Sequence, residues 1–511
     1  MNIISVDLGT TNLKAAVYDQ TLQMLHLQSE PVTYEKAGDF VEFDADEYFS
    51  QILTIIQKVA VYGWQQNREK IVQIVLTGQA ESLILLDKSC RPVCPGISWL
   101  DMRSSQECLE LSAAFLQEQC YRITGQPELI PTWPITKILW MKKNRPDLAQ
   151  KTAYYLLLKD YIAFRLCGKM AGDHSIYCFS HYFHITERNY WKEILDYCSV
   201  QVRQLPQLMP SGSIAGFLKE EFACPKSGLS EGTKINIGTL DHFAGMIGAG
   251  CIKKGQISES AGTVLSLAAF TEKPVFDSGR VANYCGPFPD SYVLLPVCES
   301  GGFSMEWFKN QFLQDTSYGE LNKILKERER LTPLIFLPYL TGVNAPDYNE
   351  DASGVFFGIR AGYDRYDLAF AVMQGVACML RKNLDSLKQS GVQIDKIIST
   401  GGGARSPIWT QLKADFAGHV IEVPDNEEAP CLGAAVMAAV QEGFYKTYEE
   451  AIAACVSIKH QYQPSKDPAF ERTYQLFCRT YDALEETFRI GRQGRGCTPC
   501  AKNTPDSMQS S

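Results

Sequence analysis

The N-terminal part of the chain alternates between short apolar runs and a small polar turn. Residues 2–7 read Asn-Ile-Ile-Ser-Val-Asp and residues 13–18 read Leu-Lys-Ala-Ala-Val-Tyr, with Leu-Gly-Thr-Thr-Asn between them. Two apolar runs joined by a glycine-containing turn predict a β-hairpin. The tip of this hairpin is rich in hydroxyl groups, which makes it a candidate for binding an anion.

The same pattern returns in the second half of the chain. Residues 255–260 lead into Ala-Gly-Thr at 261–263, and an apolar run follows over 264–270. This pattern predicts a second hairpin. One such hairpin in each half suggests two related lobes, although two copies alone do not establish an internal duplication.

Helical stretches separate and follow these hairpins. Helices are expected over 147–166, 191–208 and 376–387, and a strand is expected over 396–399. Near the C-terminus, large apolar residues recur at steps of four and three, which predicts one packed face of an amphipathic helix. This face consists of Phe470, Tyr474, Phe477, Tyr481, Leu484 and Phe488. The composition then turns to Gly, Arg, Ser, Pro and Cys, so residues 491–511 are predicted to form a disordered tail.

Composition and charge narrow the class of protein. A chain of 511 residues is long enough for about three domains at roughly 150 residues each. The hydrophobic fraction of 45% and the charged fraction of 21% are those of a globular protein, which excludes a disordered or fibrous chain. The net charge is −9 and no run of five basic residues occurs, which argues against nucleic acid as a partner.

Targeting signals and cysteine usage point to the cytoplasm. No apolar stretch approaches the ~20 residues that span a bilayer, and the N-terminus lacks a signal-peptide pattern, so no membrane partner is expected. The 17 cysteines are interpreted mostly as buried, reduced thiols, because a disulfide scaffold is normally short and dense in cysteine. Cys497 and Cys500 have redox spacing but lie in the predicted tail, so an incidental pair is favoured. For His174, His181 and His184, a structural role is favoured over a metal site.

The first stretch with candidate chemistry is the N-terminal hairpin. Asp7 ends its first strand, and Gly-Thr-Thr-Asn at 9–12 offers backbone and hydroxyl donors to phosphate oxygens, with Lys14 close behind. An acid at a strand end can hold Mg²⁺ directly or through water. The same residues also fit an ordinary β-turn, so this stretch alone leaves both interpretations open.

The second stretch is a strand over 234–237 followed by a glycine-rich turn with one acid, Asp241, and a helix of small residues. An acid in this position can accept a proton from a substrate hydroxyl, as phosphoryl transfer requires. On local sequence, Asp241 fits a helix cap at least as well.

The third stretch has three glycines at 401–403 between an apolar strand and a helix opened by Ser406-Pro407. Glycines let a nucleotide approach the backbone, and a helix N-terminus favours anions. The third glycine of a dinucleotide fingerprint is missing, which argues against a dinucleotide site.

In this order and spacing, the three stretches resemble the FGGY family of carbohydrate kinases, over about residues 1–490. Further matches are Thr77-Gly78-Gln79 with Glu81, the Trp99, Asp101 and Arg103 segment, Gly262-Thr263, Gly301 to Phe308, and Glu428 to Ala435. The resemblance implies an α/β fold of two actin-like (ribonuclease H-like) lobes with an active-site cleft between them. It lowers the domain count to a sugar-binding lobe over 1–240 and an ATP-binding lobe over 241–490, followed by the tail over 491–511.

The resemblance also implies roles for individual residues. Asp241 matches the catalytic base, and Asp7 matches the acid associated with Mg²⁺. Phosphate contacts are expected from Thr10, Thr11, Asn12, Lys14, Gly262 and Thr263. Nucleotide contacts are expected from Gly302, Glu306, Gly402, Gly403 and Ser406. The sugar is expected near Gln79, Glu81, Trp99, Asp101, Arg103, Asp241 and His242.

The implied activity is ATP- and Mg²⁺-dependent phosphorylation of a hydroxyl group of a small sugar or polyol. A ketopentose such as xylulose is the first expectation, with gluconate, another ketose or a polyol as alternatives. The family's xylulokinases have Met-His at the position of Ala80-Glu81, and its glycerol kinases have Arg-Glu there. Trp99 and Asp101, in contrast, resemble the pattern of xylulokinases and gluconokinases.

An alternative of another class is a non-catalytic sugar- or nucleotide-binding sensor or scaffold. Such a protein is expected to lack a catalytic acid or a phosphate turn, and none is missing here. The sequence leaves the oligomeric state open, a homodimer included.

Overall fold

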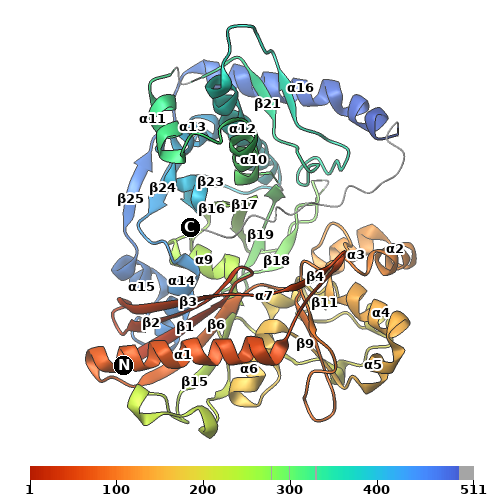
Figure 1. The fold of residues 1–511 in the computed structure, drawn as a ribbon, viewed down its shortest axis with the longest axis vertical. Coiled ribbons are helices and arrows are strands. Elements are labelled where there is room, and N and C mark those ends of the chain that lie inside the picture. The colour runs from red at the N-terminus through yellow and green to blue at the C-terminus, as the bar shows by residue number, and fades with distance from the viewer. Residues whose placement is uncertain (278, 299, 329–330, 494–511) are drawn as a thin grey trace. The chain divides into compact units, whose positions relative to one another are not determined.

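The computed structural model describes residues 1–277, 279–298, 300–328 and 331–493 (Figure 1). The chain folds into two compact units, each assembled from segments that lie apart in the sequence. Unit 1 comprises Met1–Lys254, Phe270–Leu294 and Pro424–Ser457, and unit 2 comprises Gly255–Ala269, Leu295–Val423 and the chain from Ile458 on. The lobe boundary expected after residue 240 stays a prediction.

A six-stranded mixed sheet lies in unit 1, in the order β14-β15-β6-β1-β2-β3. Its strands are β1 (Asn2–Leu8), β2 (Asn12–Asp19), β3 (Met24–Pro31), β6 (Ile71–Gly78), β14 (Ile214–Phe217) and β15 (Lys234–Leu240). β1 and β2 form the predicted hairpin, whereas β6 runs parallel to both β1 and β15. Leu8 pairs with Gly78, which in turn pairs with Leu240. Three parallel strands therefore end at one edge of the sheet, and the residues that follow them meet there.

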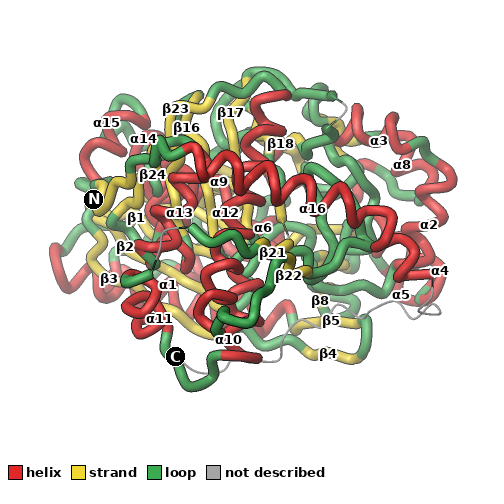
Figure 2. Tube along the Cα trace, turned by 90° about the horizontal axis from the view of Figure 1, so that it is seen from above, coloured by secondary structure: helices red, strands yellow, loops and turns green. Residues whose placement is uncertain are grey.

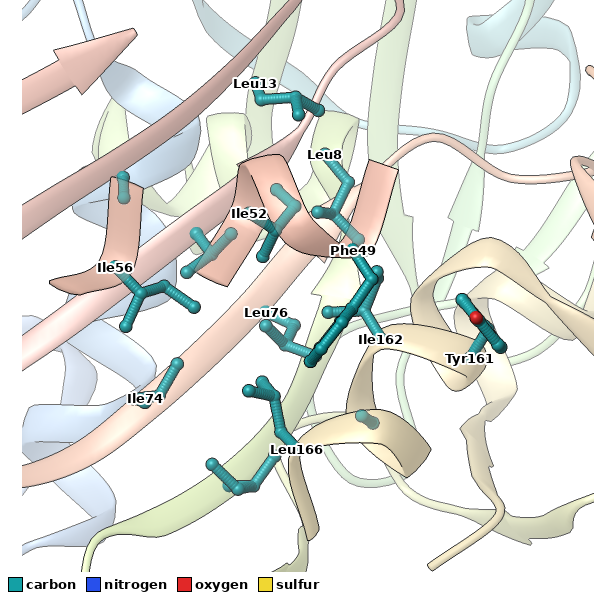
Figure 3. Packing of buried hydrophobic residues seen from close by; sticks show 14 of the residues in the cluster. Leu8, Leu13, Phe49, Ile52, Ile56, Ile74, Leu76, Tyr161, Ile162 and Leu166 are labelled. Carbon is teal, nitrogen blue, oxygen red and sulfur yellow. The ribbon is translucent and has the colours of Figure 1, made fainter. Parts of the chain in front are cut away.

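One face of this sheet is covered by α1 (Ala45–Asn67) and α6 (Leu158–Cys167). Figure 3 shows Leu8, Ile52 and Ile162 among the side chains of this buried cluster. Because side chains alternate between the two faces of a strand, the intervening residues of β1 and β6 are directed to the other face.

On that other face lie α9 (Asp241–Gly248) and α14 (Ala429–Gln441), which cross at glycines. A Cβ atom on Gly433 would lie 1.8 Å from the carbonyl oxygen of Ala244, and one on Gly248 would lie 1.9 Å from that of Ala429. Both helices therefore require glycine at the crossing, which confirms the close packing expected from the small residues after Asp241.

Unit 1 also contains a second sheet, further helices and short strand pairs. A five-stranded sheet runs in the order β4 (Glu35–Ala37), β5 (Phe40–Phe43), β8 (Gly96–Ile97), β7 (Leu83–Leu86) and β9 (Tyr154–Leu157). The remaining helices are α2 (Ser105–Ala114), α3 (Gln117–Thr124), α4 (Pro134–Asn144), α5 (Pro146–Lys151), α7 (His174–Tyr177), α8 (Lys192–Tyr197) and α15 (Tyr448–Cys455). Short strand pairs are β10 (Ala171–Asp173) with β13 (Gln207–Met209), β11 (Phe183–His184) with β12 (Asn189–Tyr190), and β18 (Asn283–Cys285) with β19 (Tyr292–Leu294).

Unit 2 contains a second mixed sheet, with neighbouring strands in the order β17 (Leu265–Thr271), β16 (Gly255–Ala261), β23 (Ile394–Thr400), β24 (Val420–Pro424) and β25 (Ile458–Tyr462). β16 and β17 form the predicted second hairpin, and β23 runs parallel to β16, so the arrangement repeats that of β2, β1 and β6. The helices are α10 (Gly302–Phe312), α11 (Tyr318–Lys326), α12 (Arg365–Gln389), α13 (Pro407–Ala417) and α16 (Pro468–Gln493). The remaining strands are β20 (Val297–Cys298), β21 (Ile335–Leu337) and β22 (Val355–Phe357).

The helical face expected near the C-terminus is confirmed, since α16 is one continuous helix (Figure 2). Five of its six predicted residues are buried and Leu484 is half-buried. α16 extends to Gln493, into the segment expected to be disordered, while Cys497 and Cys500 lie outside the described residues. The helix expected over 376–387 lies within the longer α12. No helix among the described residues is long and apolar enough to cross a membrane.

Two expected helices are wrong. The segment 147–166 divides into α5, β9 and α6, because residues 154–157 pair antiparallel with β7. The segment 191–208 is α-helical only in α8, and its end joins β13, which pairs with β10. In both segments, pairing with a distant strand overrides the local helical pattern.

Candidate active site

Two carboxylates stand at the shared edge of the unit 1 sheet. Asp7 is the last residue but one of β1, and Asp241 follows β15 as the first residue of α9. The pKa of Asp7 is raised to about 7, first by burial and then by the negative charge of Asp241, while the Lys14 ammonium acts in the opposite direction. Oδ1 of Asp7 is buried and has no hydrogen-bond partner among the described residues. The edge therefore offers a buried anionic oxygen to a cation.

Asp241 is held by the turn into α9. Its Oδ1 accepts the N–H of His242 at 2.6 Å. Burial raises the pKa of Asp241, and the His242 N–H and the Lys159 ammonium counteract that rise in part. The N-cap position of α9 belongs to Leu240, so the structure does not support the alternative in which Asp241 merely caps the helix.

Lys14 lies across the hairpin from Asp7, because the two residues are paired in the register of β1 and β2. Its Nζ donates to Oε2 of Glu428 at 2.6 Å, just before α14 begins. Burial acts to lower the pKa of Lys14, but the hydrogen bond and charge of Glu428 leave it above its ordinary value. Glu428 also raises the pKa of Asp7. In the sequence, Glu428 was part of a segment that resembles the family, but no role was assigned to it. The structure places it beside Lys14 and close enough to Asp7 to affect its pKa.

The hairpin tip is joined to the expected sugar loop by side-chain hydrogen bonds. Trp99 donates from Nε1 to Oγ1 of Thr10 at 2.9 Å, and Gln79 donates from Nε2 to the carbonyl oxygen of Gly9 at 3.3 Å. Ser82 links the two, since it donates to Gln79 Oε1 at 2.9 Å and accepts the Trp99 N–H at 3.0 Å. Thr11 and Asn12, at the end of the tip, are exposed. Gln79, Trp99 and Thr10 thus belong to one hydrogen-bonded group, while their contacts with sugar and phosphate stay predictions.

Asp101 and Arg103 are turned toward each other. Arg103 donates to Oδ2 of Asp101 at 2.7 Å and to Oε1 of Glu42 at 2.7 Å, and its guanidinium lies 4.3 Å from the centre of the Phe40 ring. Oδ2 of Asp101 also accepts the N–H of Val41 at 2.7 Å. The pair is satisfied by its own contact and by residues of β5, so the structure gives it a part in fixing this loop to β5; contact with the sugar stays a prediction.

Glu81 and Lys137 are oppositely charged groups that interact within unit 1. Glu81 adopts a left-handed backbone conformation with φ 68°, and its Oε2 is buried without a hydrogen-bond partner among the described residues. Its pKa is raised to about 7 by burial, against the effect of Lys137. Lys137, on α4, is fully buried, donates to the Ser98 carbonyl oxygen at 2.8 Å, and has a pKa lowered to about 8 by burial. Sequence reasoning missed Lys137, although a lone lysine within an apolar helix face was a usable signal.

His242 adds a second kind of polar group beside Asp241. Its Nε2 is buried and has no hydrogen-bond partner within the described part of the chain. Burial lowers its pKa to about 4, so the imidazole is neutral at physiological pH. A neutral ring with one unpartnered nitrogen can exchange a hydrogen bond with a ligand hydroxyl, as the sequence expectation requires.

The three histidines of residues 174–184 do not form a metal site in the structure. Throughout the described ranges, no three His, Cys, Asp or Glu side chains are placed to hold a metal ion together. His181 is fully buried with both ring nitrogens lacking a partner among the described residues, and burial lowers its pKa to about 3.

Replacing His181 by Phe is expected to change the pH dependence of stability. A buried histidine with a lowered pKa takes up its proton only on unfolding, so it removes stability as pH falls below about 6.5. Between pH 8 and pH 5, His181→Phe should gain about 2 kcal/mol of unfolding free energy relative to the wild type. Urea unfolding of both proteins at the two pH values measures this difference, and parallel pH profiles would contradict a neutral buried His181.

Unit 2 brings its predicted residues together at the tip of the second hairpin. Gly302 donates its N–H to the carbonyl oxygen of Gly262 at 2.8 Å, and Phe303 donates to that of Thr263 at 3.0 Å. A Cβ atom on Gly302 would lie 2.3 Å from the Gly262 carbonyl oxygen, so this contact requires glycine. Glu306 lies half-buried one turn into α10.

The Gly401–Gly403 loop also lies at the tip of the second hairpin, against Ala261. A Cβ atom on Gly403 would lie 2.6 Å from that of Ala261, at the end of β16, and Gly401 has a φ of 80° that favours glycine. Gly402 begins a short 3-10 turn, where an added Cβ would meet no atom within 4 Å. Ser406 caps α13 by accepting the Trp409 N–H at 3.3 Å, as the Ser-Pro pattern predicts. Three glycine-bearing motifs thus converge within unit 2.

Comparisons with known proteins agree with this arrangement. Residues 2–248 match the N-terminal domain, and residues 258–442 the C-terminal domain, of the FGGY family of carbohydrate kinases. The xylulose kinase of Bacillus subtilis is 29% identical over 456 residues, covering 88% of this chain and 90% of its own length. The gluconokinase of the same organism is 26% identical over 488 residues, covering 92% and 93% of the two chains.

Solved structures agree as well. The structure of a xylulose kinase from Brucella ovis has 25% identity and a TM-score of 0.88 over 95% of this chain and 100% of that one. That of a gluconate kinase from Lactobacillus acidophilus, at 24% identity, shows the same fold with a TM-score of 0.87 over 96% of this chain and 99% of that one. The expected α/β, actin-like fold is therefore confirmed. With both family domains present in order, the chain belongs to the FGGY family of carbohydrate kinases, phosphotransferases that use ATP as donor and an alcohol group as acceptor.

Proposed function

We propose that this protein transfers the γ-phosphate of ATP to a hydroxyl group of a ketopentose such as xylulose, with Asp241 as the general base. The observation that carries the proposal is the pair of half-buried carboxylates, Asp7 and Asp241, at the ends of two parallel strands on either side of β6, with the Oδ1 atom of Asp7 itself buried. Like charges held close together where burial removes part of their solvation destabilise a fold, so their presence here indicates a function. The raised pKa of Asp241 makes it a stronger base toward a sugar hydroxyl than an exposed aspartate.

Asp7 is the residue we assign to Mg²⁺. The unpartnered buried Oδ1 of Asp7 fits such an ion, which is bound by one or two carboxylates together with water and substrate phosphates. Mg²⁺ in this family of reactions neutralises the charge that develops on the transferred phosphoryl group. On the chain itself, we assign the phosphate oxygens to the backbone N–H groups of residues 10–12 and to the hydroxyl groups of Thr10 and Thr11, with Lys14 supplying positive charge.

For the nucleotide, we assign the convergent motifs of unit 2. Gly262 and Thr263 are proposed to face its phosphates, and Gly302, Glu306, Gly402, Gly403 and Ser406 to contact the rest of the molecule. Support comes from two close approaches that exclude a Cβ atom, of Gly302 to the Gly262 carbonyl oxygen and of Gly403 to the Ala261 side chain. They bring the N-terminus of α10 and the glycine loop to the tip of the second hairpin. Because its described cysteines are free thiols, we place the enzyme in the cytoplasm, where ATP is available.

A neutral sugar is favoured over an aldonate by the charges of unit 1. Asp7, Asp241 and Glu81 are carboxyl groups at or near the expected sugar side, so an anionic substrate would add one more negative charge to a site that already disfavours ionisation. Lys137 is the cation facing Glu81, and its Nζ is already bonded to the Ser98 carbonyl oxygen. The xylulose kinases among the relatives support the same choice.

ADP release over a panel of ketoses, aldonates and polyols tests this proposal. We expect xylulose to give the highest kcat/KM and gluconate a value at least about tenfold lower, since one unfavourable charge contact amounts to ~1.4 kcal/mol or more. Mass spectrometry of the product identifies the phosphorylated compound. A preference for gluconate would contradict the substrate assignment, and silence across the whole panel would favour a non-catalytic binding protein.

A further inference from the structure

We infer that Ser175, held by Asp173 and Lys159, is a positioning residue for Asp241. This inference rests on the proposed function, because it takes Asp241 as the base. The three side chains are almost fully buried in unit 1, with exposed fractions of 0%, 0% and 1%. They come from α7, β10 and α6, far from β15 and α9 in the sequence.

The contact with the Asp241 turn is made by one hydroxyl group. Oγ of Ser175 accepts the backbone N–H of Leu240, the residue directly before Asp241, at 3.0 Å. Leu240 is the last residue of β15 and the N-cap of α9. The hydrogen bond therefore lies at the point where the strand turns into the helix, and it helps to set the direction in which the Asp241 side chain leaves the turn.

The direction of each hydrogen bond follows from proton counting. A serine hydroxyl has one proton and two lone pairs. Ser175 donates its proton to Oδ1 of Asp173, whose other oxygen is paired with the Lys159 Nζ. Its two lone pairs therefore accept the Leu240 N–H and the hydroxyl of Thr239, whose oxygen lies 2.9 Å away. Every hydrogen-bonding site of Ser175 is filled, which fixes its rotamer.

The ion pair behind Ser175 makes this arrangement rigid. Asp173 holds Ser175 twice, because Oδ1 accepts both its backbone N–H, at 3.0 Å, and its hydroxyl. Lys159 compensates the charge of Asp173, and its ammonium also acts on the Asp241 carboxylate. A small shift of a catalytic group lowers turnover strongly without changing how substrate is held. We therefore assign to Ser175 an effect on kcat rather than on sugar binding.

Ser175→Ala is the first test. It removes the acceptor for the Leu240 N–H, and kcat should fall by about 10- to 100-fold. KM for xylulose, or for the panel compound with the highest turnover, should change by less than about threefold. Ser211→Ala is the matched control, because Ser211 donates to the same Asp173 Oδ1 at 3.0 Å and has no such bond to Leu240; it should keep near wild-type kcat. Ser175→Thr, which retains the hydroxyl, should restore most of the activity.

A double-variant cycle separates positioning from general damage. If Ser175 acts through Asp241, Ser175→Ala should change kcat by less than about threefold in an Asp241→Asn background, since the group it positions is already gone. The same factor in both backgrounds, or a fall as large in Ser211→Ala, would overturn the inference. Full activity of Asp241→Asn alone would instead overturn the base assignment on which it rests.

Thr239→Val covers the case in which Ser175→Ala does not fold. It removes the hydroxyl that donates to Ser175 while keeping the backbone carbonyl that accepts from Thr77 at 2.9 Å. We expect kcat to fall by about three- to tenfold, and again not in the Asp241→Asn background. Wild-type kcat in Thr239→Val together with unchanged KM would count against the inference.

Discussion

Replacing Asp241 by asparagine is expected to lower kcat by about 10³-fold while the protein still folds. Asparagine has nearly the same shape, and its Oδ1 can still accept the His242 N–H that the aspartate accepts at 2.6 Å. What is lost is the proton acceptor, and a positioned general base contributes typically 10²- to 10⁴-fold. Because the carboxylate acts on the reacting hydroxyl rather than on binding, kcat should fall far more than KM rises.

Steady-state ADP release at saturating ATP and sugar measures the effect. Asp160→Asn is a matched control, since burial also raises the pKa of Asp160, in this case to about 7, and its carboxylate accepts the Tyr177 hydroxyl at 2.7 Å. It should keep kcat within about threefold of the wild type, whatever its effect on stability. Undiminished activity in Asp241→Asn would contradict its assignment as the base.

The elements that carry the phosphate chemistry were predictable because their signals are local. Both hairpins were expected from apolar runs on either side of a glycine-containing turn, and the structure has them as β1–β2 and β16–β17. The cap at Ser406 and the close crossing of the helix after Asp241 also follow from short patterns of residue types. Each of these features depends on backbone conformations that a few neighbouring residues determine.

The features that sequence reasoning missed depend on pairing between distant segments. Residues 154–157 were expected in a helix, and they form β9 because β7 offers a partner more than sixty residues away in the chain. The roles of three other buried polar residues also depend on distant partners. Lys137 interacts with Glu81, Lys159 pairs with Asp173, and Ser175 accepts the Leu240 N–H. No local period or motif marks such a contact, because a buried lysine or serine reads as an irregular polar residue until its partner is known.

Asp7→Asn is expected to act on activity and stability in opposite directions. Loss of the carboxylate removes the assigned Mg²⁺ contact, and kcat should fall by about 100-fold or more, as for other charge-stabilising groups in phosphoryl transfer. Without metal or nucleotide, however, the variant should be more stable. Burial and the negative charge of Asp241 raise the pKa of Asp7 to about 7, so at pH 8 the folded protein holds a carboxylate that would be better solvated on unfolding.

The size and sign of the stability change distinguish a functional acid from a structural one. Urea unfolding at pH 8 with a chelator should show Asp7→Asn gaining up to about 4 kcal/mol, because it removes a carboxylate whose pKa the fold raises from 3.8 to about 7 and whose Oδ1 is unpartnered among the described residues. Asp101→Asn is the matched comparison: its fully buried carboxylate is satisfied by Arg103 and the Val41 N–H, so the same substitution should lose about 3 kcal/mol. If Asp7→Asn proves as destabilising as Asp101→Asn, the Asp7 carboxylate stabilises the folded protein, which would contradict the expected gain in stability. If Asp7→Asn is instead more stable than the wild type, the Asp7 carboxylate lowers the stability of unit 1. A residue that lowers stability is retained for its function, here the binding of a cation that compensates its negative charge.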